Sequence, residues 1–249
     1  AGKLYSVIPS NGTGDCTVVR NTTATRFNNS MILVDSAANT PRINYLIAGG
    51  TPFILDEVQD TNESNFSEDF TNSFYTKVAI TVSVISAINP RGVLSSNKLI
   101  PSTLASQHFV STTNNKKVLS VIAKANGYST VILFFTVHDS SVVFDVLNGV
   151  ILSTSGTATG KIEVLANGYF RCSATTTLST HTQSRVYVIN GTTFADRNIA
   201  GNGVDGINLF GHQTSDILTS YIPSLGASAT TRNADVITVA PPVGTVKIT

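Results

Sequence analysis

The chain has 249 residues, of which 41% are hydrophobic and 12% are charged, with a formal net charge of +1 at pH 7. A chain of this length can bury one sizeable β-core together with a smaller annex. The small net charge gives no electrostatic basis for binding nucleic acid or an anionic membrane surface. No apolar run approaches the roughly 20 residues that a membrane-spanning helix needs. Charged residues are rare, so the surface is expected to consist mostly of Thr, Ser and Asn.

The first segment, Ala1–Glu57, consists of short apolar runs that are broken by Pro and Gly. The run Leu4–Ile8 ends at Pro9, and a flexible turn follows at Asn11–Asp15. Such runs are too short to close a hydrophobic core by themselves. We therefore expect an extended N-terminal annex that folds on another surface or pairs with copies of itself.

The middle of the chain is expected to be rich in β-strands, with one short helical turn before them near Asn65–Phe74. The expected strands are Val118–Ala125, Thr130–Val137, Ser141–Leu147, Lys161–Leu165, Tyr169–Thr177, Arg185–Ile189 and Ile207–Phe210. Asn-Gly pairs punctuate this stretch, and Asn-Gly favours the tight turns of β-hairpins. Short strands at this spacing predict an all-β fold, an antiparallel sandwich or barrel.

Two of these runs indicate how the faces of their strands are covered. Thr130–Val137 carries apolar side chains on both parities, which predicts a central strand buried on both faces. Tyr169–Thr177 has Cys172 on its apolar parity and Tyr169 and Arg171 on its polar parity. That alternation predicts one buried face and one exposed face.

The end of the chain is expected to be irregular. Gly206 and Gly211 flank Ile207–Phe210, which predicts a closing strand with close backbone approach at both ends. Ala240–Gly244 is typical of an extended polyproline-type linker, and Val246–Thr249 alternates like the start of a strand. We expect an N-terminal annex (residues 1–57), a β-domain (residues 58–218) and an extended C-terminal tail (residues 219–249).

The cysteines give no sign of a metal site. Cys16 and Cys172 are far apart in the sequence, and neither has a CxxC partner. Because Cys172 lies on the apolar parity of its strand, we expect a buried free thiol. A long-range disulfide is the alternative.

Catalytic motifs are not evident in the sequence. The four histidines form no HExxH pattern, and no Ser lies in a GxSxG elbow. We expect His138 and Asp139 to form a solvated turn pair and His181 to be exposed in a Ser/Thr-rich loop. Glycoside hydrolysis needs two carboxylates held about 5–10 Å apart, and nothing places Glu68 and Asp69, or another such pair, across a cleft. We do not expect an enzyme.

The order of several segments resembles the opening of many tailed-bacteriophage virion proteins. These segments are Leu4–Pro9 (LYSVIP), Thr22–Asn28 (TTATRFN), Ser36–Tyr45 (SAANTPRINY) and Pro52–Glu57 (PFILDE). In those proteins similar segments precede a carbohydrate-binding-module-like jelly roll. Asn65–Lys77 (NFSEDFTNSFYTK) resembles the opening of that module, with Tyr75 where Trp is usual. Later matches, in the same order, are Asn97–Leu99, Val121–Ala125, Asn167–Cys172, Gly206–Gln213, Thr219–Pro223 and Thr231–Val236.

This resemblance covers nearly the whole chain. It implies a structural virion protein of the head- or tail-fibre type, assembled in the host cytoplasm. It also implies a homo-oligomer, often a trimer, that docks on other virion proteins. The implied fold is an antiparallel jelly-roll sandwich between an extended annex and an extended tail. Jelly rolls of this kind often hold a structural Ca²⁺, for which Asp196, Asp205 and Asp216 are candidate ligands; no other cofactor is expected.

A host-surface polysaccharide is a further expected partner. Tyr169 and Arg171 share the polar parity of one strand, and Arg185 and Tyr187 share one parity of another. If those faces coincide, they form a Tyr/Arg surface that could hold a sugar; the alternative is that these side chains cover a sheet with their apolar stems. The candidate glycan-binding residues are Tyr169, Arg171, Arg185, Tyr187, Asn208 and His212.

Three functions remain open at this point. The first is a fibre or decoration protein of the virion, whose annex and tail mediate oligomerisation and docking. The second is a monomeric glycan-binding module that acts in host recognition. The third is a polysaccharide depolymerase.

Overall fold

The structure is a computed structural model that describes residues 3–6, 16–84, 86–136 and 139–239. The chain divides into two compact units. Unit 1 contains residues 1–60, 219–221 and 231–249, and unit 2 contains residues 61–218 and 222–230. The expected end of the annex at Glu57 lies close to the observed passage into unit 2 after Asp60.

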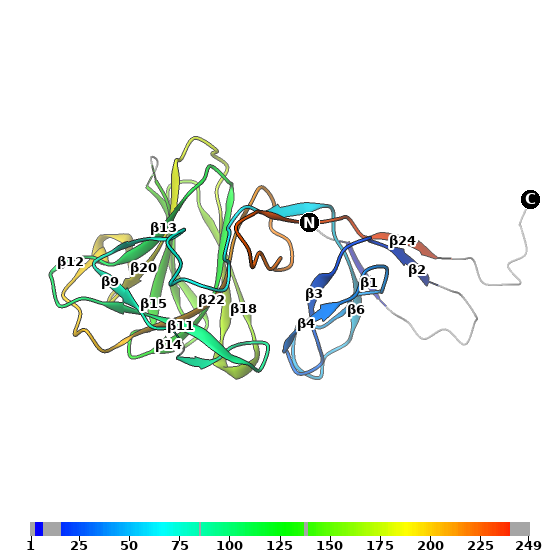
Figure 1. The fold of residues 1–249 in the computed structure, drawn as a ribbon, viewed down its shortest axis with the longest axis horizontal. Coiled ribbons are helices and arrows are strands. Elements are labelled where there is room, and N and C mark those ends of the chain that lie inside the picture. The colour runs from blue at the N-terminus through cyan, green and yellow to red at the C-terminus, as the bar shows by residue number, and fades with distance from the viewer. Residues whose placement is uncertain (1–2, 7–15, 85, 137–138, 240–249) are drawn as a thin grey trace, which may run out of the picture. The chain divides into compact units, whose positions relative to one another are not determined.

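Unit 1 is built from short antiparallel strands (Figure 1). Its three-stranded sheet has the order β1 (Lys3–Ser6), β6 (Phe53–Asp56), β5 (Ile43–Asn44). The other two sheets pair β3 (Ala24–Phe27) with β4 (Leu33–Ser36), and β2 (Cys16–Val19) with β24 (Val236–Val239). Because two-stranded sheets are marginally stable in water, tertiary contacts must hold these strands in place.

The C-terminal segment differs from the expected extended tail. β24 pairs with β2 in a continuous register from Cys16↔Val239 to Val19↔Val236. The expectation was wrong because β24 pairs with a strand from the N-terminal part of the chain. The local sequence pattern around β24 carries no information about so distant a partner. The linker expected at Ala240–Gly244 and the strand start expected at Val246–Thr249 lie outside the described residues.

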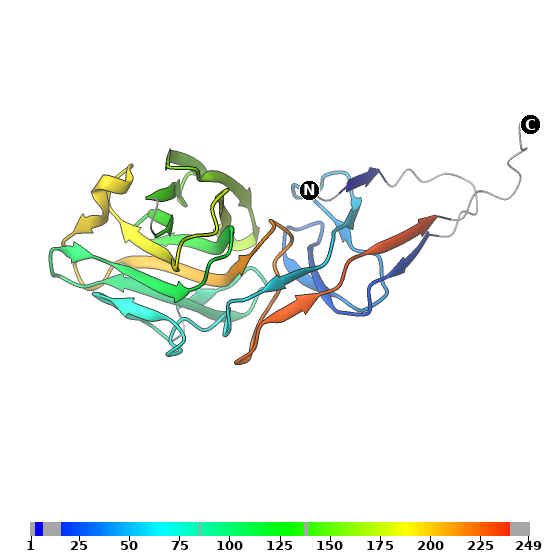
Figure 2. The same cartoon turned by 90° about the horizontal axis from the view of Figure 1, so that it is seen from above.

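Unit 2 contains two antiparallel sheets, which form two layers of strands in Figures 1 and 2. The seven-stranded sheet has the order β10 (Ala87–Ile88), β11 (Leu94–Pro101), β22 (Gly206–Ser215), β14 (Val118–Asn126), β19 (Phe170–Thr175), β18 (Thr159–Val164), and β9 (Ile80–Val82) also pairs with β11. The six-stranded sheet has the order β17 (Val150–Ser155), β16 (Ser140–Asp145), β15 (Thr130–Phe135), β20 (Gln183–Ile189), β13 (Phe109–Thr113), β8 (Thr76–Val78).

The remaining strands are short. β12 (Ser106–Gln107) pairs with β21 (Asn198–Ile199). β7 (Asp60–Asn62) and β23 (Thr230–Arg232) each contain a point where the chain passes from one unit to the other.

The two sheets of unit 2 share one hydrophobic core. Every second side chain of the central strands points into it, as the alternation of a strand requires. The seven-stranded sheet contributes Leu99, Leu119, Val121, Ala123, Cys172, Ala174, Ile207 and Leu209. The six-stranded sheet contributes Val110, Val131, Leu133, Phe135, Val142, Phe144, Val186 and Val188. The all-β class expected from the sequence is confirmed.

The expected strands of the middle region are present, with ends that differ by a few residues. β15 is buried at all its positions and lies between β16 and β20, which confirms the expected central strand. The helical turn expected near Asn65–Phe74 is wrong, because that segment forms successive turns. Helical structure in the described residues is limited to the short 3₁₀ segments η1 (Ala166–Gly168) and η2 (Phe194–Arg197).

The expected close backbone approach is found at Gly206. A Cβ atom at this position would lie 2.1 Å from the carbonyl oxygen of Leu99 on the neighbouring strand β11. β22 does not close the sheet at its edge, however, since it lies between β11 and β14.

Candidate functional site

The six candidate glycan-binding residues do not form one surface. Arg171 lies on β19 and Tyr169 immediately precedes that strand, in the seven-stranded sheet. Arg185 and Tyr187 lie on β20, in the six-stranded sheet. Both pairs have the parity opposite to the shared core, so they lie on the outer faces of two different sheets. The sequence pattern gave each strand its parity correctly but could not say which sheet each strand joins.

The residues on the seven-stranded sheet are also buried, which corrects the expected exposed face of β19. Arg171 is 4% exposed, and its Nη2 donates a hydrogen bond to Ser120 Oγ at 3.3 Å. Tyr169 is fully buried, and its hydroxyl donates to Ser96 Oγ at 2.7 Å. Both polar groups are therefore engaged within the sheet and are not presented to a ligand.

Asn208 and His212 lie on opposite faces of β22, although their spacing predicts one face. Gly211 has φ 63°, and the strand carries a bulge there, because Phe210 pairs with Ile122 while Gln213 pairs with Ser120. Two residues of β22 thus oppose a single residue of β14, which reverses the parity beyond that point.

Both residues on β22 are buried and have partners inside the protein. The Oδ1 atom of Asn208 accepts hydrogen bonds from Ser86 and Asn126. His212 packs edge-on against the ring of Tyr75 and shares a hydrogen bond with Ser64 Oγ at 2.8 Å. Burial lowers the pKa of His212 from 6.5 to about 3, so the ring is neutral at physiological pH.

The outer face of the six-stranded sheet retains two of the candidate residues. The Arg185 guanidinium lies over the Phe109 ring at 4.6 Å and within 6.0 Å of the Phe134 ring. Its Nη1 donates to the Tyr187 hydroxyl at 3.1 Å, and its Nη2 donates to Gln183 Oε1 at 3.0 Å. Aromatic faces attract a guanidinium electrostatically, so this arrangement fixes Arg185 at the surface of the sheet.

A second arginine continues this arrangement. Phe194 of η2 stacks on Phe134 with ring centroids 4.6 Å apart and planes at 12°. The Arg197 guanidinium then lies over the Phe194 ring at 4.2 Å. Arg185, Arg197 and Phe194 are partly exposed. We call this set of six residues the arginine–aromatic face: Phe109, Phe134, Arg185, Tyr187, Phe194 and Arg197.

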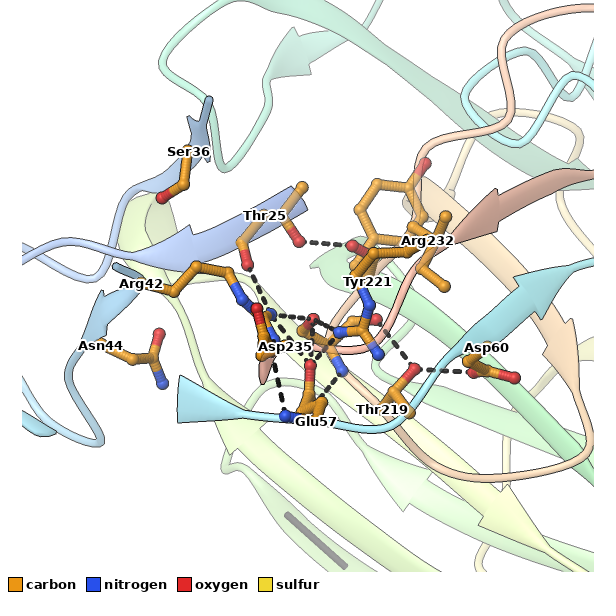
Figure 3. Close-up of polar contacts among 12 residues, drawn as sticks. Thr25, Ser36, Arg42, Asn44, Glu57, Asp60, Thr219, Tyr221, Arg232 and Asp235 are labelled. Atoms are coloured by element: carbon orange, nitrogen blue, oxygen red, sulfur yellow. Dashed lines mark hydrogen bonds and ion pairs between the residues drawn. The ribbon is translucent and has the colours of Figure 1, made fainter. Parts of the chain in front are cut away.

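Unit 1 contains a buried cluster of charged side chains at the ends of its short strands (Figure 3). We call it the ion cluster: Arg20, Arg42, Glu57, Arg232 and Asp235. Arg42 pairs with both carboxylates, Arg232 pairs with Glu57, and Arg20 pairs with Asp235 at 3.0 Å.

Hydrogen bonds complete the ion cluster. The Ser220 backbone N–H donates to Glu57 Oε1 at 2.7 Å, and the Ser220 hydroxyl donates to Glu57 Oε2 at 2.6 Å. Asp235 accepts from the Glu57 backbone N–H at 3.0 Å. The cluster therefore joins an N-terminal segment to two C-terminal segments, and it replaces the larger apolar core that such short strands lack.

Electrostatics hold Glu57 ionised in this buried position. Burial by itself raises the pKa of the Glu57 carboxyl group, but the charges of Arg232 and Arg42 and the hydrogen bonds from Ser220 and Arg42 outweigh it. The pKa falls from 4.5 to about 2. Removing one partner of such a buried pair is costly because it leaves an uncompensated charge.

The ion cluster was not identified from the sequence. Its members are scattered single charges, and none belongs to a motif. One signal was available. Charged residues are only 12% of this chain, and the five charged residues of the ion cluster lie beside short apolar runs that cannot form a core by themselves. The contribution of Phe194 and Arg197 was missed because they belong to η2, a 3₁₀ segment of four residues that is too short for a periodic pattern to mark the direction of a side chain.

The expected calcium ligands are not brought together. Asp196 caps η2, Asp205 accepts a hydrogen bond from Asn202, and Asp216 accepts one from Lys116. Among the residues with described positions, no three His, Cys, Asp or Glu side chains gather as a metal site would require.

Three further expectations concern single side chains. His181 is buried against the Phe135 ring, so the expectation of an exposed residue is wrong. Cys172 is a buried free thiol, as expected, and burial raises its pKa. His138 lies outside the described residues.

Comparisons with known proteins add no family assignment. No protein-family model matches the chain, and no curated protein is significantly similar to it. No helix in the described part of the chain is long and apolar enough to cross a membrane.

Proposed function

We propose that this protein is a structural component of a bacteriophage virion, a fibre or decoration protein that assembles as a homo-oligomer. Unit 1 is the assembly and docking part, and unit 2 is a jelly roll that is displayed on the particle. The ordered sequence resemblance to tailed-bacteriophage virion proteins supports this proposal, as does the all-β fold.

The strand pairing of unit 2 supports the jelly roll. In chain order its main strands are β11, β13, β14, β15, β16, β19, β20 and β22. The first pairs with the last, the second with the seventh, the third with the sixth and the fourth with the fifth. This nested pairing is that of a long hairpin wrapped into two sheets, which is the plan of a jelly roll. β17 and β18 extend the edges of the two sheets.

The construction of unit 1 carries the assembly proposal. The ion cluster joins an N-terminal and a C-terminal segment in one unit, yet β2 and β24 have no further neighbour among the described strands. Val19 and Val236 oppose each other in register and are 46% and 56% exposed. An open strand edge beside an exposed apolar pair can be covered by another copy of the chain.

Analytical ultracentrifugation of point variants tests this assignment. Val236→Glu places a charge on the β2–β24 sheet, so we expect it to shift the full chain from oligomer to single chain. Val204→Glu, which changes a 68% exposed residue of unit 2, is the matched control and leaves the oligomer intact. Equal behaviour of the two variants would remove this surface from the proposed interface.

Glycan binding is a second candidate function, which the arginine–aromatic face favours. Ligand-binding sites are typically lined by aromatic and other apolar side chains, with a few polar groups that orient the ligand. The arginine–aromatic face combines both kinds of group. The full chain can be tested for retention on immobilised host-cell polysaccharide. Absence of retention across neutral and acidic polysaccharides would contradict this second function and leave the structural proposal standing.

A further inference from the structure

The arginine–aromatic face contains two arginines that have no acidic partner among the described residues. Arg171, Arg91 and the three arginines of the ion cluster each lie within 4.0 Å of a carboxylate. Arg185 and Arg197 form no such pair with any residue that the structure describes. No carboxylate of a described residue therefore neutralises their positive charges by direct contact.

The stacked rings hold the two guanidinium groups on one surface. Arg185 lies over Phe109 and near Phe134, Phe134 stacks on Phe194, and Arg197 lies over Phe194. These rings already fix the positions of both guanidinium groups in the free protein. Binding a ligand therefore costs little side-chain entropy.

Both arginines keep N–H donors for a ligand. A guanidinium has five N–H donors. Arg185 donates hydrogen bonds to Gln183 Oε1 and to the Tyr187 hydroxyl. Arg197 donates from Nη1 to the Phe194 carbonyl at 3.1 Å. The acidic neighbour Asp196 is engaged elsewhere, since its Oδ2 accepts from the backbone N–H groups of Thr192 and Thr193.

We propose that the arginine–aromatic face binds an acidic polysaccharide whose sugar carboxylates are bound by Arg185 and Arg197. Arginine–carboxylate contacts are charge-assisted and geometrically specific. The exposed edge of the Phe194 ring supplies apolar contact to the sugar. This inference rests on the glycan-binding candidate and specifies its ligand class, which the sequence alone left open.

The test measures binding of the full chain to oligogalacturonate by isothermal titration calorimetry. A neutral gluco-oligosaccharide of the same length is the comparison ligand. We expect binding of the acidic oligosaccharide that weakens as salt is added, because partly exposed charges are screened. We expect binding of the neutral oligosaccharide to be at least tenfold weaker.

Arg197→Gln is the main variant, because Arg197 is less involved in packing than Arg185. It is expected to weaken oligogalacturonate binding at least tenfold, as loss of a charge-assisted contact would do. Lys161→Gln is the matched control: it removes the same charge from β18 in the other sheet, where the lysine side chain is 55% exposed. We expect it to bind like the unaltered chain.

Each outcome decides between the proposals. Equal affinity for the neutral and the acidic oligosaccharide would overturn the acidic ligand class while leaving glycan binding in place. Equal weakening by Arg197→Gln and Lys161→Gln would show attraction to overall charge and would overturn this site. No binding to either sugar would contradict both the inference and the glycan-binding candidate, whereas the oligomer measurements on Val236→Glu would be unaffected.

Discussion

Arg42 and Asp235 lie 193 positions apart in the sequence and form a buried ion pair in unit 1. Arg42 precedes β5 in the N-terminal segment, and Asp235 precedes β24 in the C-terminal segment. Asp235 also pairs with Arg20, and Arg42 also pairs with Glu57. The described N-terminal and C-terminal segments of unit 1 thus depend on the same few charges for their common structure.

Glu57→Gln is predicted to destabilise the protein strongly. The substitution removes the negative charge that Arg42 and Arg232 share. Arg42 keeps its pair with Asp235, but Arg232 is left buried without its carboxylate partner, at a cost of about 3–5 kcal/mol. Chemical denaturation of the full chain measures the free energy of unfolding. As a control, Asp216→Asn breaks the pair between Lys116 and Asp216, whose side chain is 62% exposed, and should cost less than about 1 kcal/mol. Similar losses for the two variants would contradict a structural role for the ion cluster.

Acid should weaken the protein in two stages. His212 has a folded pKa of about 3 against 6.5 unfolded, so the unfolded chain binds a proton first. Stability therefore falls as the pH drops below 6.5. The contribution of His212 to this fall ends near pH 3, where the folded protein also binds the proton. Glu57, with a pKa of about 2 against 4.5, contributes stability that is fully present above pH 4.5 and is lost as the pH falls through 2.

Thermal unfolding as a function of pH separates these two groups. Between pH 6.5 and 4.5 the decline assigned to His212 precedes that of Glu57. His212→Gln should reduce the slope in that window, and Glu57→Gln should leave the slope there unchanged. A slope that His212→Gln does not alter would assign the decline to other groups.

Gly206→Ala is predicted to destabilise unit 2. The added methyl group would lie 2.1 Å from the carbonyl oxygen of Leu99, a backbone atom that cannot rotate away. We expect a loss of about 1–3 kcal/mol, typical of overpacking a close contact. Gly226→Ala is the matched control, because no described residue has an atom within 4 Å of its added methyl group. Equal unfolding free energies for the two variants would contradict the close approach of β22 to β11.

The seven strands of unit 2 that were expected between Val118 and Phe210 could be predicted because each is a local pattern. Apolar side chains on both parities marked β15, alternation marked β19, and Asn-Gly marked the turns between strands. Long-range arrangement could not be predicted in the same way. The bulge at Gly211 reverses the face of His212, and only the pairing with β14 reveals it.

The candidate site was less predictable than the fold for a related reason. Arg185 and Tyr187 were identified, but the rings that order Arg185 come from β13 and β15, and the ring that stacks on Phe134 comes from η2. The charges of the ion cluster meet only when β24 pairs with β2 at the other end of the chain. Contacts of such long sequence separation are set by the whole fold, and no local periodicity records them.

The solution mass of the purified full chain, measured by light scattering over a range of concentrations, tests the central claim most directly. We predict a stable mass that is a multiple of one chain, with three chains as the value that the fibre-type resemblance implies. That result would support unit 1 as the part that joins copies. A single-chain mass at every concentration would contradict assembly through unit 1 and would favour a free-standing glycan-binding module.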